Sequence, residues 1–342
     1  MKRIGNLFES CFTEENLYNA YLEARKHKRA KRSCFEFEKN LGLSLDILRK
    51  EIFDGNYTPK PYFKFPLFDS KPRIIYAPAF RDIVVQHAIY KIIYPIFNAS
   101  FVDTSFACRK GKGVHACADF VQESLKKCHD DDYILHLDVK KFFYTIDHQI
   151  LADLLRKKIK DERLLDIMLE FVKHDQPLGI PIGNLLSQLY ALIYLNPLDH
   201  FIKRELKIIH YTRYVDDMVL IGLTLDQSHD YKQKIESFVD EHLNLGLSKA
   251  LIVPIRKGLN FVGYRTWRSK RFVRKHSMFK FSCSLKKQKL DSINSLMAHA
   301  LRTSTLMHYV RRFKQEQPEL ISMLPPMSKN VSIERRSVQI HK

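Results

Sequence analysis

Two adjacent carboxylates, Asp216 and Asp217, lie between short apolar β-type runs in the stretch 213–222. Like charges placed together oppose each other's ionisation unless a cation sits beside them. The pair therefore predicts a metal site. The simpler interpretation is a solvated turn, since Asp favours turns for its local hydrogen bonding.

A third carboxylate, Asp138, ends a strand-like run at residues 133–139 and is followed by two Lys and two Phe. One acid on a strand and two at a hairpin turn could hold two Mg²⁺ ions, with Mn²⁺ as a substitute, about 3.5–4 Å apart. That arrangement performs in-line nucleotidyl transfer. Taken alone, Asp138 could instead be an ordinary strand end or helix cap.

Two more stretches accompany the acids. Residues 178–191 form a Gly/Pro turn that opens into an apolar helix pattern, and residues 258–264 read as a short strand and turn. These four stretches, in this order and spacing, resemble a reverse transcriptase over residues 71–264. Asp138 matches the first catalytic acid, Tyr214–Asp217 the aromatic-x-Asp-Asp signature, and Phe261–Tyr264 the primer grip.

The resemblance implies an α+β fold of the right-hand polymerase type, with an antiparallel palm sheet backed by helices and a helical thumb. The expected divisions are an N-terminal helical basic region (1–60), fingers (61–130), a palm with the acids and primer grip (131–267), and a helical thumb and tail (268–342). No maturase or endonuclease domain is expected after residue 264.

The segment Gly179–Gln188 departs from the common reverse transcriptase pattern, because Ile182-Gly183 replaces Gln-Gly. In this it resembles the enzymes of diversity-generating retroelements, as do the stretches 71–75, 82–88 and 106–115. Such enzymes copy a template repeat RNA into adenine-mutagenised cDNA. An apolar Ile182 forfeits hydrogen bonds that report base-pair geometry, so mismatch rejection should weaken. Alternatively, Ile182 only packs under the following helix.

The resemblance also implies residue roles. Asp138, Asp216, Asp217 and the Val139 carbonyl would hold the two metal ions. One ion would lower the pKa of the primer 3′-hydroxyl and the other would neutralise the triphosphate. Arg73 would bind the triphosphate as a planar bidentate donor, with Lys64 and Lys71 as weaker candidates. Lys249 is a loosely aligned candidate for protonating the pyrophosphate.

An aromatic steric gate against the ribose 2′-hydroxyl is expected at Phe143, with core packing as its alternative role. Gly183 is expected to let the backbone approach template and nucleotide, or simply to supply unusual φ freedom. Ser187 and Gln188 could bond the template strand or merely begin a helix. Tyr214 is expected along the primer end, though an aromatic on a buried strand is also unremarkable.

Composition agrees with a polyanion partner. The 342 residues carry 57 Lys and Arg against 38 Asp and Glu, a net charge of +19, and such a surface attracts nucleic acid. Solubility or ribosome association would explain the charge equally well. Six cysteines without a Cys-x-x-Cys pair indicate reduced thiols. Without a run of about 20 apolar residues, no membrane association is expected and the predicted location is cytoplasmic.

Local patterns place the supporting elements. Helices are expected over 14–55, interrupted by the basic segment Arg25–Arg32, and over 82–98 and 148–172; a strand ribbon is expected over 62–68 and 72–76. Residues 265–280 carry seven bases interleaved with Trp267, Phe272 and Phe279, which suits a nucleic-acid groove. A helical thumb should follow over 285–324, then a disordered tail from 328.

Three functions remain in competition. The first is an RNA-directed DNA polymerase of a diversity-generating retroelement, which binds template RNA, primer and dNTPs and needs an accessory variability determinant protein. The second is a defence-associated reverse transcriptase that makes untemplated or repetitive DNA. The third is a non-catalytic RNA-binding scaffold, although an unused acid cluster would still carry the cost of repulsion.

Overall fold

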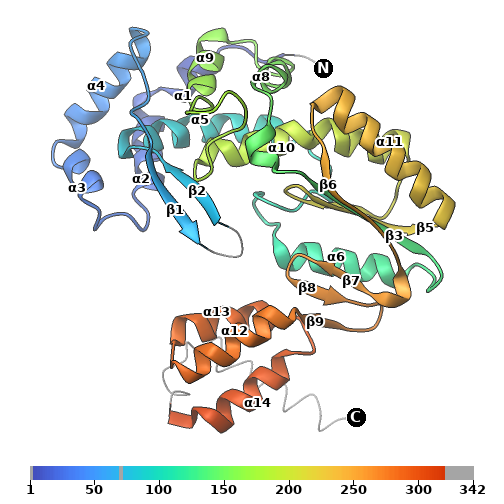
Figure 1. Cartoon of the computed structure of the whole chain (residues 1–342). Coiled ribbons are helices and arrows are strands. Elements are labelled where there is room, and N and C mark those ends of the chain that lie inside the picture. The colour runs from blue at the N-terminus through green and yellow to red at the C-terminus, as the bar shows by residue number, and fades with distance from the viewer. Residues whose placement is uncertain (1–2, 69–71, 320–342) are drawn as a thin grey trace.

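The computed structural model describes residues 3–68 and 72–319; Lys71 and the predicted disordered tail lie outside this range. The first part of the chain is helical (Figure 1), with α1 Leu7–Cys11, α2 Glu14–Ala24, α3 Arg32–Glu38 and α4 Leu41–Phe53 around α5 Phe80–Asn98. The Thr13 hydroxyl accepts from the Asn16 amide at 3.1 Å and caps α2. The basic segment forms turns between α2 and α3, as predicted.

The predicted ribbon is present as β1 Phe63–Phe68 and β2 Pro72–Ala77, an antiparallel pair in which Phe63 lies opposite Ala77. It projects away from the helices (Figure 1). Two of its aromatic side chains are unusually open, with Phe63 71% and Phe68 80% exposed, whereas Tyr76 in β2 is buried. Such exposed apolar surface on a strand pair is typical of a binding element.

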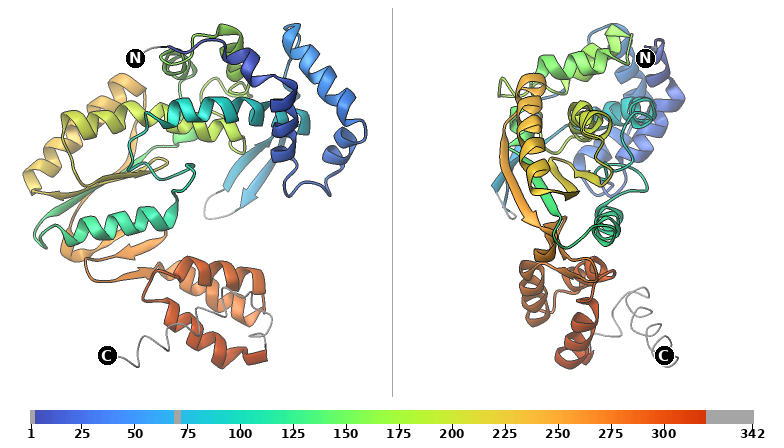
Figure 2. Two further views of the ribbon diagram at one scale, coloured as in Figure 1. Left: turned by 180° about the vertical axis from the view of Figure 1, so that it is seen from behind. Right: turned by 90° about the vertical axis from the view of Figure 1, so that its right-hand side faces the viewer.

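The central sheet has the order β4-β5-β3-β6, and all its neighbours are antiparallel. Its strands are β4 Tyr211–Tyr214, β5 Asp217–Leu223, β3 Tyr133–Val139 and β6 Leu247–Pro254. Helix α11 Leu225–Leu243 packs on β3 and β6, whereas α6 Val114–Lys126 packs on β4 and β5 from the other side (Figures 1 and 2). Helix α6 therefore contacts the palm sheet, although its residues fall within the predicted fingers.

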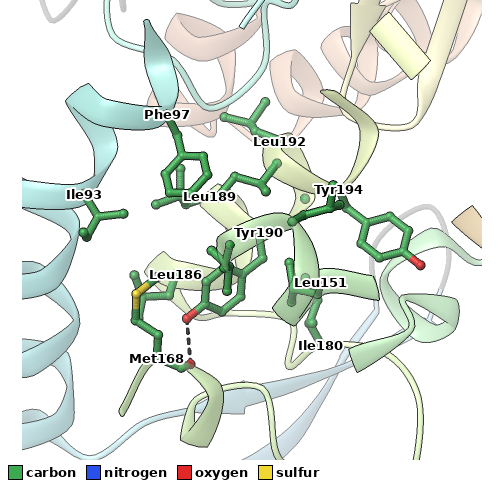
Figure 3. Close-up of a cluster of buried hydrophobic side chains, with 14 of the residues drawn as sticks. Ile93, Phe97, Leu151, Met168, Ile180, Leu186, Leu189, Tyr190, Leu192 and Tyr194 are labelled. Carbon is green, nitrogen blue, oxygen red and sulfur yellow. Dashed lines mark hydrogen bonds between the residues drawn. The ribbon is translucent and has the colours of Figure 1, made fainter. Parts of the chain in front are cut away.

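The largest core lies between α5 and α10 Leu185–His200, with α8 His148–Arg156 and α9 Glu162–Glu170 completing it. Tyr190 is fully buried there, and its hydroxyl donates to the Met168 carbonyl at 2.7 Å (Figure 3). The stretch 148–172 is two helices instead of one. Between the two helices the backbone is not helical, because residues 158–160 form a β-bridge with Ile4 of the N-terminal segment.

A second sheet and a helical unit follow, comprising β7 Leu259–Phe261, β8 Tyr264–Thr266, β9 Arg271–Val273, α12 Lys275–Lys286, α13 Leu290–Ala300 and α14 Leu306–Glu316. The three helices share a core separate from the main one, in which the Phe281 and Tyr309 rings stack at 3.8 Å. The described residues also include three further short helices: α7 Phe142–Thr145, the π-helix Phe201–Glu205 and the 3₁₀-helix Ile255–Lys257. The predicted mixed fold with an antiparallel palm sheet and helical thumb is confirmed.

The stretch 265–280 is only partly available as a nucleic-acid groove. Arg271 is 3% exposed and donates to the Asp119 carboxylate at 2.8 Å and the Ala118 carbonyl at 2.7 Å. It therefore anchors β9 to α6 instead of facing solvent. The last six residues of the stretch belong to α12, so the thumb begins earlier than residue 285.

Candidate active site

The three acids meet at one end of the central sheet. Asp138 lies next to the end of β3 and is directly opposite Asp217, the first residue of β5. Asp216 occupies the two-residue turn between β4 and β5. The antiparallel register thus joins two sequence motifs that lie 78 positions apart.

The turn that carries Asp216 has an unusual backbone. Val215 has φ +59°, whereas Asp216 is not among the positive-φ residues. A positive φ at the first central position alone is the pattern of a type II′ turn, which favours Gly there. For a β-branched residue it is an outlier that surrounding contacts must hold in place. One such contact is the Val139 amide, which donates to the Asp216 carbonyl at 3.3 Å.

The electrostatics of the site centre on Asp216. Burial, followed by the neighbouring Asp138 and Asp217 carboxylates, raises the pKa of Asp216 to about 6, while the positive charge of Arg73 opposes the shift. A bound cation would relieve the repulsion between these clustered carboxylates and favour their ionised forms. Arg73, in the exposed part of β2, is thus close enough to the acids to influence them.

The donor set fits hard divalent cations, since all three side chains offer carboxylate oxygens. The carboxylates are nevertheless engaged by the protein: the Ser248 hydroxyl donates to Asp138 Oδ2 at 2.5 Å, and His136 Nε2 lies 2.5 Å from Asp217 Oδ1. Across residues 3–68 and 72–319, no three His, Cys, Asp or Glu side chains converge as a ready-made metal cluster. Binding two ions would therefore require these side chains to turn toward a common point.

The motifs did not reveal His136 or Ser248. His136 is 3% exposed, and its Nε2 also lies 2.8 Å from Lys249 Nζ. One nitrogen can donate to Asp217 or accept from Lys249, but not both. Burial lowers the pKa of Lys249, and Asp217 and Asp138 partly oppose that shift. The available signal was a His two residues before Asp138, on the same face of an otherwise apolar strand.

The predicted phosphate-binding bases differ in their surroundings. Lys64 Nζ pairs with the Asp175 carboxylate at 2.9 Å and lies over the Tyr76 ring at 5.6 Å. That hydrogen bond, the largest of several causes, lowers the pKa of Asp175 to about 2. Lys64 is therefore already paired with an acid. Of the predicted phosphate-binding bases, Arg73 is the one whose charge acts on the pKa of Asp216. Lys71 lies outside the described residues.

The two phenylalanines after Asp138 are distinct. Phe142 is 1% exposed and packs against Tyr194, whereas Phe143 is half-buried at the edge of the core. The Ile180 amide donates to the Phe143 carbonyl at 2.7 Å and fixes this backbone. Core packing is thus the role of Phe142, and Phe143 remains the predicted gate.

The segment around Ile182 joins the ribbon to the palm. The Tyr76 amide in β2 donates to the Ile182 carbonyl at 2.8 Å, and the Ile182 side chain is half-buried. Gly183 has φ +115°, and a Cβ there would lie 2.9 Å from the Ile75 side chain. The backbone conformation and the close contact with Ile75 are therefore enough to require Gly at this position, which agrees with the φ-freedom alternative.

The start of α10 separates its two polar residues. Ser187 is buried and donates to the Pro181 carbonyl at 2.7 Å, so it shapes the turn, whereas Gln188 is exposed. Gln86 from α5, which the motifs missed, caps the helix: its Oε1 accepts from the Leu185 and Leu186 amides at 3.0 and 3.3 Å. Its position inside a helix hid this role from sequence patterns.

The predicted primer grip is the tight hairpin between β7 and β8. Val262 and Gly263 have φ +40° and +88°, the signs of a type I′ turn. The Phe261 ring lies edge-on to His136 at 5.7 Å, which connects this hairpin to the acids. Tyr264 is fully buried, and its hydroxyl donates to the His299 carbonyl of the thumb at 2.8 Å. Tyr214 is half-buried against the cluster that holds Phe261.

Sequence comparisons identify the family to which this chain belongs. The family described as "Reverse transcriptase (RNA-dependent DNA polymerase)" matches residues 59–266, more than half of the chain. The chain belongs to the reverse transcriptase family. The predicted enzyme class, an RNA-directed DNA polymerase, is confirmed at the level of this family.

Individual relatives are distant. The chain is 26% identical over 277 residues to Protein YkfC of Escherichia coli, covering 67% of this chain and 73% of YkfC. It is 26% identical over 211 residues to the group II intron-encoded protein LtrA of Lactococcus lactis, covering 57% of this chain but 35% of LtrA. A telomerase structure from Candida albicans, with a telomeric RNA fragment, aligns at TM-score 0.49 and 12% identity over 78% of this chain and 55% of that one.

Within the part of the chain that the structure describes, no helix combines the length and the apolar character that crossing a bilayer requires.

Proposed function

We propose that this protein copies RNA into DNA by two-metal nucleotidyl transfer at Asp138, Asp216 and Asp217. The observation that carries the proposal is the register that sets Asp138 opposite Asp217, with Asp216 in the adjoining turn. Burial, and then both neighbouring carboxylates, raise the pKa of Asp216. Bound Mg²⁺ would activate the primer 3′-hydroxyl and stabilise the leaving pyrophosphate. The Val139 carbonyl would complete the second ion site.

The protein's own residues would orient the substrates. Arg73, whose positive charge acts on the pKa of Asp216, would bind the triphosphate. Phe143 would exclude a ribose 2′-hydroxyl. Lys249, whose Nζ lies 2.8 Å from His136 Nε2, would be the candidate proton donor to the leaving pyrophosphate. Template RNA and primer would lie between the ribbon and the thumb, and the exposed Gln188 would contact the template strand.

The finer role we propose is mutagenic copying of a template repeat RNA in a diversity-generating retroelement, in the cytoplasm and together with an accessory variability determinant protein. The half-buried Ile182 supports this, because its apolar side chain offers no hydrogen bond that would favour a correct base pair over a mismatch. Its carbonyl is tied to β2, so the side chain has a fixed backbone. Fidelity that is unchanged in Ile182→Gln would remove the physical argument.

The test is Mg²⁺-dependent dNTP incorporation on a primed RNA template, with wild type beside the double variant Asp216→Asn/Asp217→Asn and the products sequenced. Activity confined to wild type, with errors opposite template adenine, is expected. Accurate copying would leave a reverse transcriptase without the mutagenic role. Repeats or homopolymers would favour the defence-associated alternative. Full activity of the double variant would refute the metal assignment.

A further inference from the structure

A buried ion pair lies directly behind the catalytic turn. Arg213 and Asp199 are both 0% exposed, and the guanidinium holds both carboxylate oxygens, with Nε to Oδ1 at 2.8 Å and Nη2 to Oδ2 at 2.5 Å. The Tyr211 hydroxyl donates to the same Asp199 Oδ1 at 2.6 Å. This two-point geometry fixes the plane of the guanidinium.

The third arm of the guanidinium reaches the turn itself. Arg213 Nη1 donates to the Val215 carbonyl at 2.8 Å. Val215 is the β-branched residue at φ +59°, immediately before Asp216. Such a conformation persists only where neighbouring contacts determine it. The donor is thus aimed at the carbonyl of a residue whose backbone conformation is unfavourable for its side chain.

The backbone of Arg213 is equally fixed. Its amide donates to the Thr104 carbonyl, and its carbonyl accepts from the Phe106 amide, each at 3.0 Å. Asp199 lies in the last turn of α10, whose opposite end is capped by Gln86 beside the Ile182 segment. The ion pair therefore connects the turn to a buried, rigid helix.

Stability alone is a weak reason for such a pair. The desolvation of two buried charges offsets much of their attraction, and well-packed apolar replacements are often neutral or stabilising. An apolar replacement would lack a hydrogen-bond donor for the Val215 carbonyl, so the ion pair can set the backbone geometry of the turn in a way that apolar residues cannot. Misplacement of a catalytic group by about 1 Å can cost on the order of 100-fold in rate.

We infer that Arg213, oriented by Asp199, is a positioning residue: its bond to the Val215 carbonyl holds the turn that presents Asp216 and Asp217 to metal. The inference rests on the proposed function, since it assumes that these carboxylates bind divalent cations. It adds two residues that no motif marks as part of the site.

The decisive variant removes both charges together, so that neither is left buried without a partner. The triple variant Asp199→Leu/Tyr211→Phe/Arg213→Met is compared with Tyr211→Phe, in which the ion pair and the Val215 bond remain. We expect the triple variant to fold, with kcat lowered about 10- to 100-fold and the primer–template Kd changed less than about 3-fold. Tyr190→Phe is the matched control, because it removes a buried hydroxyl bond to the Met168 carbonyl that does not involve the turn (Figure 3).

The second readout is Mn²⁺ binding without nucleotide, measured from the electron paramagnetic resonance signal of the free ion. We expect weaker Mn²⁺ binding in the triple variant than in Tyr211→Phe. Equal Mn²⁺ affinity together with equal kcat would overturn the inference. If the triple variant does not fold, Arg213→Lys takes its place, because it keeps the charge but loses the planar fork; the same two outcomes apply. Wild-type protein that binds Mn²⁺ but synthesises no DNA would point to a missing partner or a scaffold role, and the Mn²⁺ comparison would still test this inference.

Discussion

Two tight hairpin turns of this molecule each begin with a valine at positive φ, but they are supported by different parts of the protein. The catalytic turn places Val215 at φ +59° before Asp216, and the primer-grip turn places Val262 at φ +40° before Gly263. Both turns join neighbouring antiparallel strands. In each, a β-branched residue occupies a conformation that L-residues rarely adopt.

The difference lies in what stands behind each turn. The catalytic turn is held by Arg213 and Asp199, both from the palm. The primer-grip turn lies against the thumb: a Cβ on Gly263 would be 3.0 Å from His299 Cε1, and the Tyr264 ring stacks on His299 at 4.4 Å. The acids are thus fixed within one unit, whereas the primer grip depends on where the thumb lies. Chemistry and primer affinity should therefore respond to different mutations.

The largest expected effect is on chemistry alone. Asp216→Asn removes a charge that would stabilise a metal ion by several kcal/mol, so kcat should fall at least about 10³-fold. The primer–template Kd should stay within about 3-fold of wild type, because Asp216 is not part of the primer grip. Single-turnover incorporation and a fluorescence anisotropy titration measure the two quantities. A parallel loss of primer affinity would break the proposed separation of the turns.

The same substitution should stabilise the metal-free protein. Because the folded-state pKa of Asp216 is raised to about 6, above its ordinary value of 3.8, wild type should lose stability as pH rises from about 4 to 6. The loss, which Asp216→Asn avoids, is at most about 3 kcal/mol. Urea unfolding in EDTA at pH 4 and pH 7.5 measures it, and Mg²⁺ at pH 7.5 should narrow the gap. Equal stability of both proteins at both pH values would contradict the electrostatic account.

The primer-grip turn should show the opposite phenotype. Gly263→Ala adds a Cβ against His299 at φ +88°, where Ala is strained, so the turn and thumb must shift. We expect the primer KM to rise about 10-fold, which corresponds to about 1.4 kcal/mol, with kcat at saturating primer within about 2-fold. Gly42→Ala is the control, since nothing lies within 4 Å of the added methyl group and Gly42 lies in the exposed face of α4. A kcat effect larger than the KM effect would show that the two turns are coupled.

Local features of the site could be predicted from sequence. The ribbon of β1 and β2 follows from alternation around a polar turn, and the positions of the acids follow from the apolar runs that flank them. Both are properties of consecutive residues. The antiparallel register that sets Asp138 opposite Asp217 is not, because it depends on how two distant strands pair.

The partners of these acids were beyond sequence patterns for the same reason. His136 and Asp217 are 81 positions apart, Ser248 and Asp138 are 110 apart, and Gln86 caps a helix 99 positions away. One usable clue was Arg213, a charged residue in a strand otherwise made for burial, since a buried charge requires a partner. For the basic stretch 265–280 the reason is different: composition does not separate Arg271, which is buried against α6, from the other six bases, whose side chains are exposed or half-buried.

The smallest expected effect concerns the junction between primer grip and thumb. Tyr264→Phe removes a buried hydroxyl that donates to the His299 carbonyl at 2.8 Å and lies 3.1 Å from Nδ1 of both His115 and His299. Losing one such bond while keeping the ring stacked on His299 should cost about 1 kcal/mol of stability. The primer KM should rise about 3-fold with kcat unchanged, because the thumb becomes less firmly placed while the acids keep their own support. Thermal unfolding and steady-state kinetics test this, with Tyr190→Phe as the matched loss of a buried hydroxyl bond elsewhere. An equal KM change in both variants would mean that the effect reflects general destabilisation and that the thumb does not specifically position the primer grip.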